Sequence, residues 1–241
     1  ERAHLIFRGH ETRRSAARRD CSTQQEPNRA LQRSYILYMQ TRTTLRREIR
    51  ARRKALSEAE RHQLADRIAG HLLAAHPFIS ARRIAAYLAG NGEVDLDPFM
   101  LAALARGKKL YLPVLSPLKD QRLWFMAFHE ETRFQPNRFG IPEPVFRKRD
   151  LIKPIQLDLV LMPLVGFDGG GNRLGMGGGF YDRTFAFRNR RRSWHRPLLI
   201  GCAYSFQRVD GLIRYPWDVP LDGVVTENGL ELFDHRSRAD V

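Results

Sequence analysis

Apolar residues recur at helical spacing in the segment TTLRREIRARRKAL, which begins at Thr43. Leu45, Ile49 and Leu56 fall on one face of the predicted helix, and arginines occupy the other faces. Thr43 or Thr44 is available as its N-cap. We expect the apolar face to pack inward and the arginines to form a basic stripe, which is usually solvated but gains a function if the fold brings it near an anion. The stripe consists of Arg46, Arg50 and Arg53.

Helix-like and strand-like segments alternate along the rest of the chain. Ser57 and Glu60 match a capping box at the start of a second helix, which continues the inward apolar face until Pro77. A third helix is expected over residues 98–105, with Asp97 as its cap. Short apolar runs predict strands at residues 84–88, 109–115, 121–128, 157–165, 198–203 and 223–226.

This alternation predicts an α/β fold. Strand, helix and strand at short spacing build βαβ units, and such units give a mostly parallel sheet with helices on both faces. At 241 residues and 43% hydrophobic composition, one domain can bury a sizeable core. We therefore expect a single three-layer domain over residues 39–235. In such sheets, ligands collect at the carboxyl ends of the strands.

Basic residues exceed acidic residues by a wide margin. The chain has 41 Lys and Arg against 26 Asp and Glu, a formal charge of +15. This excess favours anionic partners such as nucleic acid, nucleotide phosphates or polycarboxylates, although heavy use of arginine on the surface explains it equally well. Two cysteines, Cys21 and Cys202, imply no disulfide framework and a reducing compartment. No apolar run approaches about 18 residues, so no membrane span is expected.

Residues 1–38 differ in composition from the rest of the chain. They are rich in arginine and small polar residues, lack sustained periodicity, and are predicted to form a disordered basic leader. A transit-like leader, a nucleic-acid tail and non-native sequence are three interpretations, and scattered acidic residues weaken the first. Met39 stands just before the first well-patterned helix, so we expect translation to start there. Residues 236–241 are expected to form a short tail.

The stretch GFDGGGNRLGMGGGFYDR, residues 166–183, follows a buried strand and leads into a predicted short helix, TFAFRNRR. Glycines let the backbone approach an anion, and the unpaired N–H groups of a first helical turn point at it. Arg173 adds a forked cation, and Asp182 adds a carboxylate able to hold Mg²⁺ on phosphates. The stretch lacks the P-loop and dinucleotide-binding patterns. Two interpretations therefore stay open: a phosphate or nucleotide site with Mg²⁺, or a connector that merely turns tightly.

Other candidate residues lie in loops. Glu93 follows a predicted strand end and is a candidate ligand contact, although a loop glutamate is more often solvated. Asp218 and Asp222 sit in a proline-bounded loop, where either supplies a second metal ligand or only forms a turn. His195 and His235 show no metal spacing with other His or Cys, and no nucleophilic constellation is evident.

The run RLGMGGGFYDRTF resembles the signature of the 5-formyltetrahydrofolate cyclo-ligase family, also called methenyltetrahydrofolate synthetases. The resemblance extends in the same order over about residues 42–228. It includes TLRREIRARRKALS, GEVDL, KKLYLPVL, NRFGIPEP, LDLVLMPLVGFD and WDVPLDGVVTE. Such collinearity is more specific than any single motif. The resemblance implies a three-layer fold akin to ribose-5-phosphate isomerase and CoA transferases, and the leader has no counterpart in the family pattern.

The resemblance also implies roles for individual positions. ATP contacts fall on the start of the first helix and on the glycine loop, with Arg42 where many family members carry lysine. Folate contacts fall on Leu88, Glu93 and part of the same loop. Arg173 is the expected catalytic residue, because it would neutralise charge on the transferred phosphate. The implied ATP positions are Arg42, Thr43, Thr44, Leu45, Arg46, Arg173, Leu174, Gly175, Met176, Gly177, Gly178, Gly179, Phe180 and Tyr181. The loop positions that also contact the folate are Met176, Gly177, Gly178, Gly179 and Phe180. The implied magnesium ligands are Asp182 and Asp218.

The family's reaction follows as an expectation. ATP phosphorylates the formyl oxygen of 5-formyltetrahydrofolate, N10 attacks the activated carbon, and 5,10-methenyltetrahydrofolate forms with ADP and phosphate. We expect a monomeric cytoplasmic enzyme that acts on ATP and on the folate, with or without a polyglutamate tail. We expect no nucleic-acid or membrane partner. A non-catalytic nucleotide-binding protein and a basic RNA-binding module remain the alternatives.

Overall fold

The computed structural model describes residues 42–118, 120–190 and 196–234. The expectations for the leader at residues 1–38, the start at Met39, the tail at residues 236–241 and the side chains of Cys21, His195 and His235 lie outside these residues. Cys202 is a buried free thiol. Among the helices described, none combines the length and the apolar composition that crossing a membrane requires.

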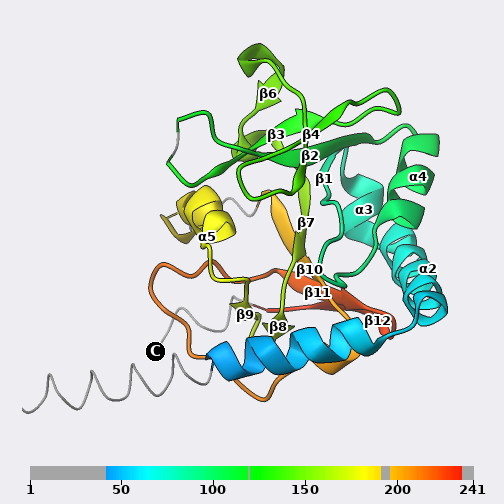
Figure 1. The fold of residues 1–241 in the computed structure, drawn as a ribbon, viewed down its shortest axis with the longest axis vertical. Helices are drawn as coiled ribbons and strands as arrows, with labels where there is room; N and C mark the ends of the chain where they lie inside the picture. The colour runs from blue at the N-terminus through cyan, green and yellow to red at the C-terminus, as the bar shows by residue number, and fades with distance from the viewer. Residues whose placement is uncertain (1–41, 119, 191–195, 235–241) are drawn as a thin grey trace, which may run out of the picture. The chain divides into compact units, whose positions relative to one another are not determined.

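An eight-stranded sheet forms the centre of the fold (Figure 1). In spatial order, its strands are β12 (Gly229–Leu232), β11 (Gly223–Thr226), β10 (Leu198–Cys202), β7 (Leu159–Pro163), β1 (Arg83–Ala85), β2 (Lys109–Leu115), β3 (Leu123–Ala127) and β6 (Leu151–Ile152). The neighbouring strands from β11 to β2 run parallel, and antiparallel strands extend both edges. The prediction of a mostly parallel sheet is therefore confirmed. The edge strands β6 and β12 lie where the sequence pattern predicts no strand.

Helices cover both faces of the sheet, as predicted (Figure 1). One face carries α2 (Glu58–Ala74), α3 (His76–Ser80) and α4 (Asp97–Ala105), and the other carries α5 (Phe180–Phe185) and the 3-10 helix η3 (Ala186–Arg190). Leu159 and Leu161 of β7 enter the core on the first face, and Val160 and Met162 enter the core on the second. Successive residues of a strand point to opposite faces, so a strand covered on both sides is apolar throughout.

The helix starts follow the sequence pattern in one case and depart from it in two. Ser57 and Glu60 form the predicted capping box of α2. The prediction of Asp97 as the cap of α4 is wrong: Asp97 is already helical, and its N–H donates to the Asp95 carboxylate at 2.9 Å. The predicted caps at residues 43–44 are also wrong, because the first helix is already formed at residue 42.

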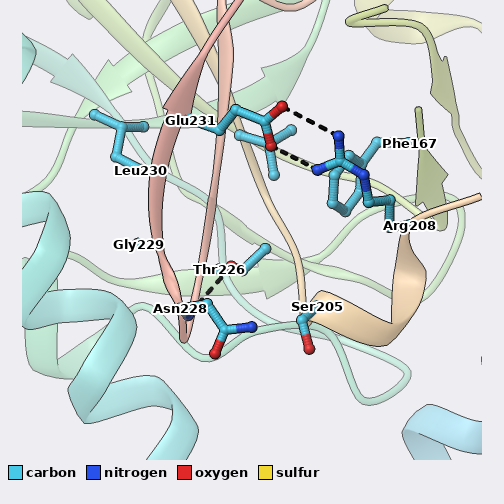
Figure 2. A pocket seen from close by; sticks show the side chains of 9 residues that line it. Phe167, Ser205, Arg208, Thr226, Asn228, Gly229, Leu230 and Glu231 are labelled. Atoms are coloured by element: carbon cyan, nitrogen blue, oxygen red, sulfur yellow. Dashed lines mark hydrogen bonds and ion pairs between the residues drawn. The ribbon is translucent and has the colours of Figure 1, made fainter. Parts of the chain in front are cut away.

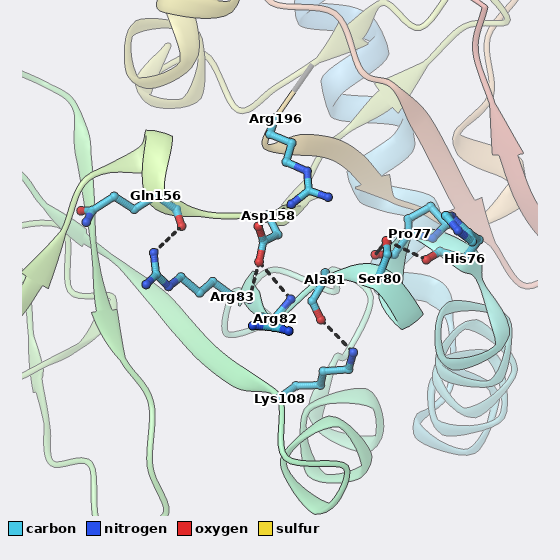
Figure 3. A network of polar contacts seen from close by, with 10 residues as sticks. All are labelled: His76, Pro77, Ser80, Ala81, Arg82, Arg83, Lys108, Gln156, Asp158 and Arg196. Carbon is cyan, nitrogen blue, oxygen red and sulfur yellow. Dashed lines mark hydrogen bonds and ion pairs between the residues drawn. The ribbon is translucent and has the colours of Figure 1, made fainter. Parts of the chain in front are cut away.

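A polar network joins segments at the amino ends of the central strands (Figure 3). Asp158, just before β7, accepts the backbone N–H groups of Arg82 and Arg83 at 2.9 Å each, and it pairs with Arg196 at 3.0 Å. Lys108, just before β2, donates to three carbonyl groups around the end of α3. Some of the chain's many basic residues therefore stabilise the fold.

The first helix, over residues 42–55, docks on a small hairpin that precedes the glycine loop. In this hairpin, β8 (Gly166–Phe167) pairs antiparallel with β9 (Arg173–Leu174). The predicted inward face of the helix is confirmed: Ile49 is buried, and Leu45 and Leu56 are partly buried against the cores. The buried cluster between helix and hairpin consists of Ile49, Val165, Leu174 and Leu212.

Candidate active site

The glycine loop joins β9 to α5 and presents backbone rather than side chains. Gly177 and Gly179 have φ values of 105° and 62°, which side-chain-bearing residues rarely adopt. Gly179 is the N-cap of α5, so the helix begins at Phe180, inside the stretch, and not after it as the sequence pattern predicted. Residues 176–178 are exposed. Because α5 has only six residues, the loop amides and nearby arginines, more than a helix dipole, would hold an anion here.

Two arginines of the first helix reach this loop. Arg46 Nε donates to the Gly175 carbonyl at 2.9 Å, and Arg50 Nη2 lies 3.2 Å from the Met176 sulfur. The docking of the helix through its apolar cluster brings both arginines to the loop. The guanidinium of Arg42, one turn earlier, lies 5.9 Å from the centre of the Tyr215 ring. The structure therefore brings together the two segments predicted to bind ATP.

Arg173 and Asp182 face each other at the base of the loop. Arg173 Nη2 donates to Asp182 Oδ1 at 2.5 Å, and the two side chains are 6% and 22% exposed. The same oxygen accepts the N–H of Val219 at 3.2 Å, so Asp182 contacts the segment that carries Asp218. Asp218 itself accepts the N–H of Tyr215 through Oδ2 at 3.0 Å. The two predicted magnesium carboxylates thus lie on adjoining segments, and the predicted catalytic arginine is paired with one of them.

Glu93 lies in a tight turn after β1. Asn91 and Gly92 have left-handed φ values of 52° and 72°. The N–H of Glu93 donates to the Gly90 carbonyl at 3.0 Å, and the N–H of Gly90 donates to Glu93 Oε2 at 3.1 Å. These two bonds fix the carboxylate against its own backbone, so the turn presents Glu93 in one orientation.

The charge of Glu93 interacts with charged and titratable groups of the first helix and of α5. Burial raises the pKa of Glu93, and the Gly90 N–H and the guanidinium groups of Arg53 and Arg50 oppose that rise. Burial also raises the pKa of Tyr181, which follows the glycine loop, and the negative charge of Glu93 raises it further. The Glu93 turn, the first helix and the start of α5 therefore form one electrostatic environment.

Several predicted ligand positions have side chains that pack in the interior. Leu174 has no exposed surface, and Leu45 packs on the same apolar cluster. Leu88 is partly buried against the larger core. Leu174 can therefore offer a ligand only its backbone, whose carbonyl already accepts the N–H of Val165 at 2.7 Å.

No group of three or more His, Cys, Asp or Glu is placed to hold a metal ion among the residues the structure describes. Asp222, the other aspartate that the sequence offered as a metal ligand, pairs with Arg188 through both oxygens, at 2.5 and 2.7 Å. It also accepts the N–H of Leu199 at 2.7 Å. Asp222 therefore joins α5's extension to the sheet, and the structure does not support it as a metal ligand.

Sequence reasoning missed two features near the loop. Arg53 was assigned to a solvated stripe, but it has no exposed surface, so that expectation is wrong at this position. The signal was available, because Arg53 follows Ile49 by four residues and therefore lies on the inward face. Phe139, in the segment NRFGIPEP, contacts the Phe180 ring with centroids 5.8 Å apart. This aromatic contact was not detectable from spacing.

A cavity of about 270 Å³ lies between the β11–β12 hairpin and residues 205–208 (Figure 2). Arg208 and Glu231 form a two-bonded ion pair at 2.6 and 3.1 Å on its wall. The Arg208 guanidinium lies 5.7 Å from the centre of the Phe167 ring. None of the residues lining the cavity is a predicted ATP, folate or magnesium position.

A strand-end site with a glycine loop, a docked arginine helix and a turn that carries a partly buried glutamate agrees with one enzyme class. The family model of 5-formyltetrahydrofolate cyclo-ligases matches residues 38–227, so the chain belongs to this family. It is 37% identical over 180 residues to the 5-formyltetrahydrofolate cyclo-ligase of Escherichia coli (strain K12), which covers 74% of this chain and 96% of that protein. The enzyme of the same name from Haemophilus influenzae is 37% identical over 184 residues, covering 76% and 95%.

Solved structures agree with this assignment. The 5,10-methenyltetrahydrofolate synthetase of Mycoplasma pneumoniae aligns with a TM-score of 0.59 at 30% identity, over 77% of this chain and 98% of that one. The Aquifex aeolicus 5,10-methenyltetrahydrofolate synthetase aligns with a TM-score of 0.66 at 31% identity, over 82% and 98%. The family resemblance inferred from the sequence is confirmed.

Proposed function

We propose that the protein converts 5-formyltetrahydrofolate to 5,10-methenyltetrahydrofolate, using ATP and releasing ADP and phosphate. The observation that supports this most is the meeting of three segments beyond the carboxyl ends of the parallel strands. The first helix arrives through Arg46, the glycine loop exposes its backbone, and the turn after β1 presents Glu93. In a cyclo-ligase family chain, this arrangement gives the nucleotide and the folate a shared floor.

The reaction needs activation, because the formyl group on N5 is an amide whose oxygen is a poor leaving group. Transfer of the γ-phosphoryl group to that oxygen breaks the bond to ADP and turns the oxygen into part of a phosphate. N10 then attacks the formyl carbon and loses its proton, the C–O bond breaks, and phosphate departs. The main tasks of the protein are to align the reactants and to neutralise phosphate charge.

The described residues suit these tasks. The exposed amides of the glycine loop and the guanidinium of Arg46 would contact phosphate oxygens. Arg173 adds positive charge below the loop, and its bond to Asp182 indicates that it also orients that carboxylate. Glu93 would accept hydrogen bonds from N–H donors of the folate. No residue is assigned as nucleophile or general base.

We propose Mg²⁺ as the companion of ATP, where it would neutralise phosphate charge and fix the phosphate geometry. Asp182 and Asp218 fit this role, because each offers hard carboxylate oxygens on adjoining segments and uses one oxygen in the hydrogen bonds described above. Mg²⁺ usually takes only one or two protein carboxylates together with water and phosphate. A cluster of three protein ligands is therefore not required.

We further propose that the enzyme acts as a cytoplasmic monomer on small molecules, without nucleic acid or membrane. The low cysteine count and the family's small-molecule chemistry support this proposal. Gel filtration of the purified full chain tests the monomer: elution as a stable dimer or larger assembly would contradict it.

An absorbance assay tests the proposed activity. Purified protein is mixed with 5-formyltetrahydrofolate, ATP and Mg²⁺, while the near-ultraviolet band of the methenyl product and the release of ADP are followed together. We expect one ADP per methenyl product, and no product when ATP or Mg²⁺ is omitted. Folded protein that binds ATP without forming product would instead support a non-catalytic nucleotide-binding protein. Binding of RNA without binding of ATP would support the RNA-binding alternative.

A further inference from the structure

Arg53 is a buried cation whose hydrogen bonds join three segments of the candidate site. Its side chain has no exposed surface. Nη1 donates to the Leu164 carbonyl, just after β7, at 3.2 Å, and Nη2 donates to the Asn91 carbonyl at 3.0 Å. Its Nε is buried without a hydrogen-bond partner among the described residues. The guanidinium thus links the first helix, the end of the central strand and the turn that carries Glu93.

The backbone of the same residue also supports this turn. A Cβ at Gly92 would lie 3.2 Å from the Arg53 carbonyl oxygen and 3.3 Å from the Arg53 Cβ. Gly92 also has a φ of 72°, so a glycine is needed there for two reasons. The turn therefore rests directly on the helix at Arg53, and the guanidinium holds the carbonyl of the preceding residue, Asn91.

A structural role alone accounts poorly for a charge at this position. A buried guanidinium pays a desolvation penalty that an apolar side chain of similar volume avoids. Consistent with this, burial lowers the pKa of Arg53, and the charge of Glu93 opposes that shift. Arg53 makes its side-chain hydrogen bonds to carbonyl groups, and neither accepting residue is charged. The nearby charge that its cation favours is the carboxylate of Glu93.

We propose that Arg53 is a positioning residue that holds the turn at residues 90–93 so that the Glu93 carboxylate meets the folate. This inference rests on the proposed role of Glu93 in folate binding. It assigns Arg53 no direct contact with ATP, because both of its bonded carbonyls lie outside the glycine loop. The loop is held instead by Arg46 and Arg50. Loss of Arg53 should therefore weaken the binding of the folate more than the binding of ATP.

Four variants of the full chain test the proposal: Arg53→Met, Arg53→Lys, Glu93→Gln and the double variant of Arg53→Met with Glu93→Gln. Arg47→Met is the matched control, because Arg47 is an exposed arginine of the same helix. Equilibrium binding of 5-formyltetrahydrofolate and of ATP is measured by calorimetry, alongside KM and kcat. We expect Arg53→Met to weaken folate binding about tenfold or more, as loss of charge-assisted hydrogen bonds does, and to change ATP binding less than about twofold.

The double variant separates positioning from general structural damage. If Arg53 acts through Glu93, adding Arg53→Met to Glu93→Gln should weaken folate binding by less than about twofold more. Arg53→Lys should fall between wild type and Arg53→Met, and Arg47→Met should match wild type. Equal losses for both substrates, or fully additive losses in the double variant, would overturn the inference.

The remaining outcomes are also distinguishable. If Arg53→Met does not fold, folate and ATP binding are compared in Arg53→Lys instead. Failure of both variants to fold would show that Arg53 stabilises the fold and does not act specifically in folate binding. If wild type binds the folate but forms no product, the proposed reaction fails while the binding comparison still tests Arg53. If wild type binds no folate, both proposals fail.

Discussion

Replacing Asp182 by asparagine tests the link between the glycine loop and the proposed metal site. Removing one partner of a buried ion pair costs about 3–5 kcal/mol. The cost should be smaller here, because Asp182 is 22% exposed and asparagine keeps an oxygen that can accept from Arg173 and from the Val219 N–H. We therefore expect the free energy of unfolding to fall by about 1–2 kcal/mol. Turnover should fall about 100-fold or more, because an amide is a poor Mg²⁺ ligand and no longer balances Arg173.

Urea denaturation and the absorbance assay over a range of Mg²⁺ concentrations measure these two effects separately. Asp222→Asn is the matched control: Asp222 also pairs with an arginine, Arg188, and both side chains are nearly buried, at 12% and 11% exposed. This control should lose at least as much stability and keep its turnover at a temperature where it is folded. Near-normal turnover of Asp182→Asn would remove Asp182 from the metal site. An equal loss of turnover in both variants would show that damage to the fold is the cause.

Three further predictions concern the segments around the loop. Ile49→Ala should lower the free energy of unfolding by about 3 kcal/mol in urea titrations, because it empties part of the cluster that docks the first helix; an unchanged midpoint would contradict that docking. Arg46→Met should raise KM for ATP about tenfold in steady-state kinetics and leave KM for the folate within about twofold, since Arg46 bonds the loop at Gly175; the reverse pattern would refute its assignment to the nucleotide. Burial raises the pKa of Glu93 above its unfolded value, so its contribution to stability is present in acid and is lost as pH rises through the raised pKa. Glu93→Gln should therefore unfold at a higher urea concentration than wild type above that pKa and at about the same urea concentration in acid; a difference in midpoint that grows toward acid would contradict a raised pKa for Glu93.

The fold was predictable where local pattern and burial agree. The apolar run at residues 157–165 predicts a doubly covered strand, and β7 places alternate residues in the two cores. The edge strand β12 was not predictable, because its pairing with β11 leaves half of its residues exposed and its pattern is weak. The start of α4 was missed because Asp97 is already helical, and its own N–H donates to the Asp95 carboxylate.

The candidate site was also predictable from the sequence only in part. The glycine loop and the arginine helix were identifiable from sequence, because each has a distinctive local composition. The ion pairs of the site could not be predicted from the sequence. Arg173 pairs with Asp182, and Asp222 pairs with Arg188, through contacts that only the tertiary structure creates. Asp218 and Asp222 lie four residues apart in one loop, and the structure alone shows that Asp222 is fully engaged.

The burial of Arg53 illustrates why charge type is a weak guide to exposure. The arginines of the first helix share a sequence context, yet the structure gives them different surroundings. Arg47 is exposed, Arg46 and Arg50 contact the loop, and Arg53 is enclosed. Helical position decides this difference, because Arg53 shares the inward face with Ile49. Helical position therefore decides the exposure of charged residues in this helix as it does that of apolar ones.

In the proposed reaction, the formyl oxygen leaves as part of phosphate after it receives the γ-phosphoryl group of ATP. Labelling that oxygen with ¹⁸O and analysing the phosphate released in a single turnover by mass spectrometry tests this directly. We expect one ¹⁸O atom in each phosphate formed with methenyl product. Methenyl product accompanied by unlabelled phosphate, with the label found in water, would contradict it.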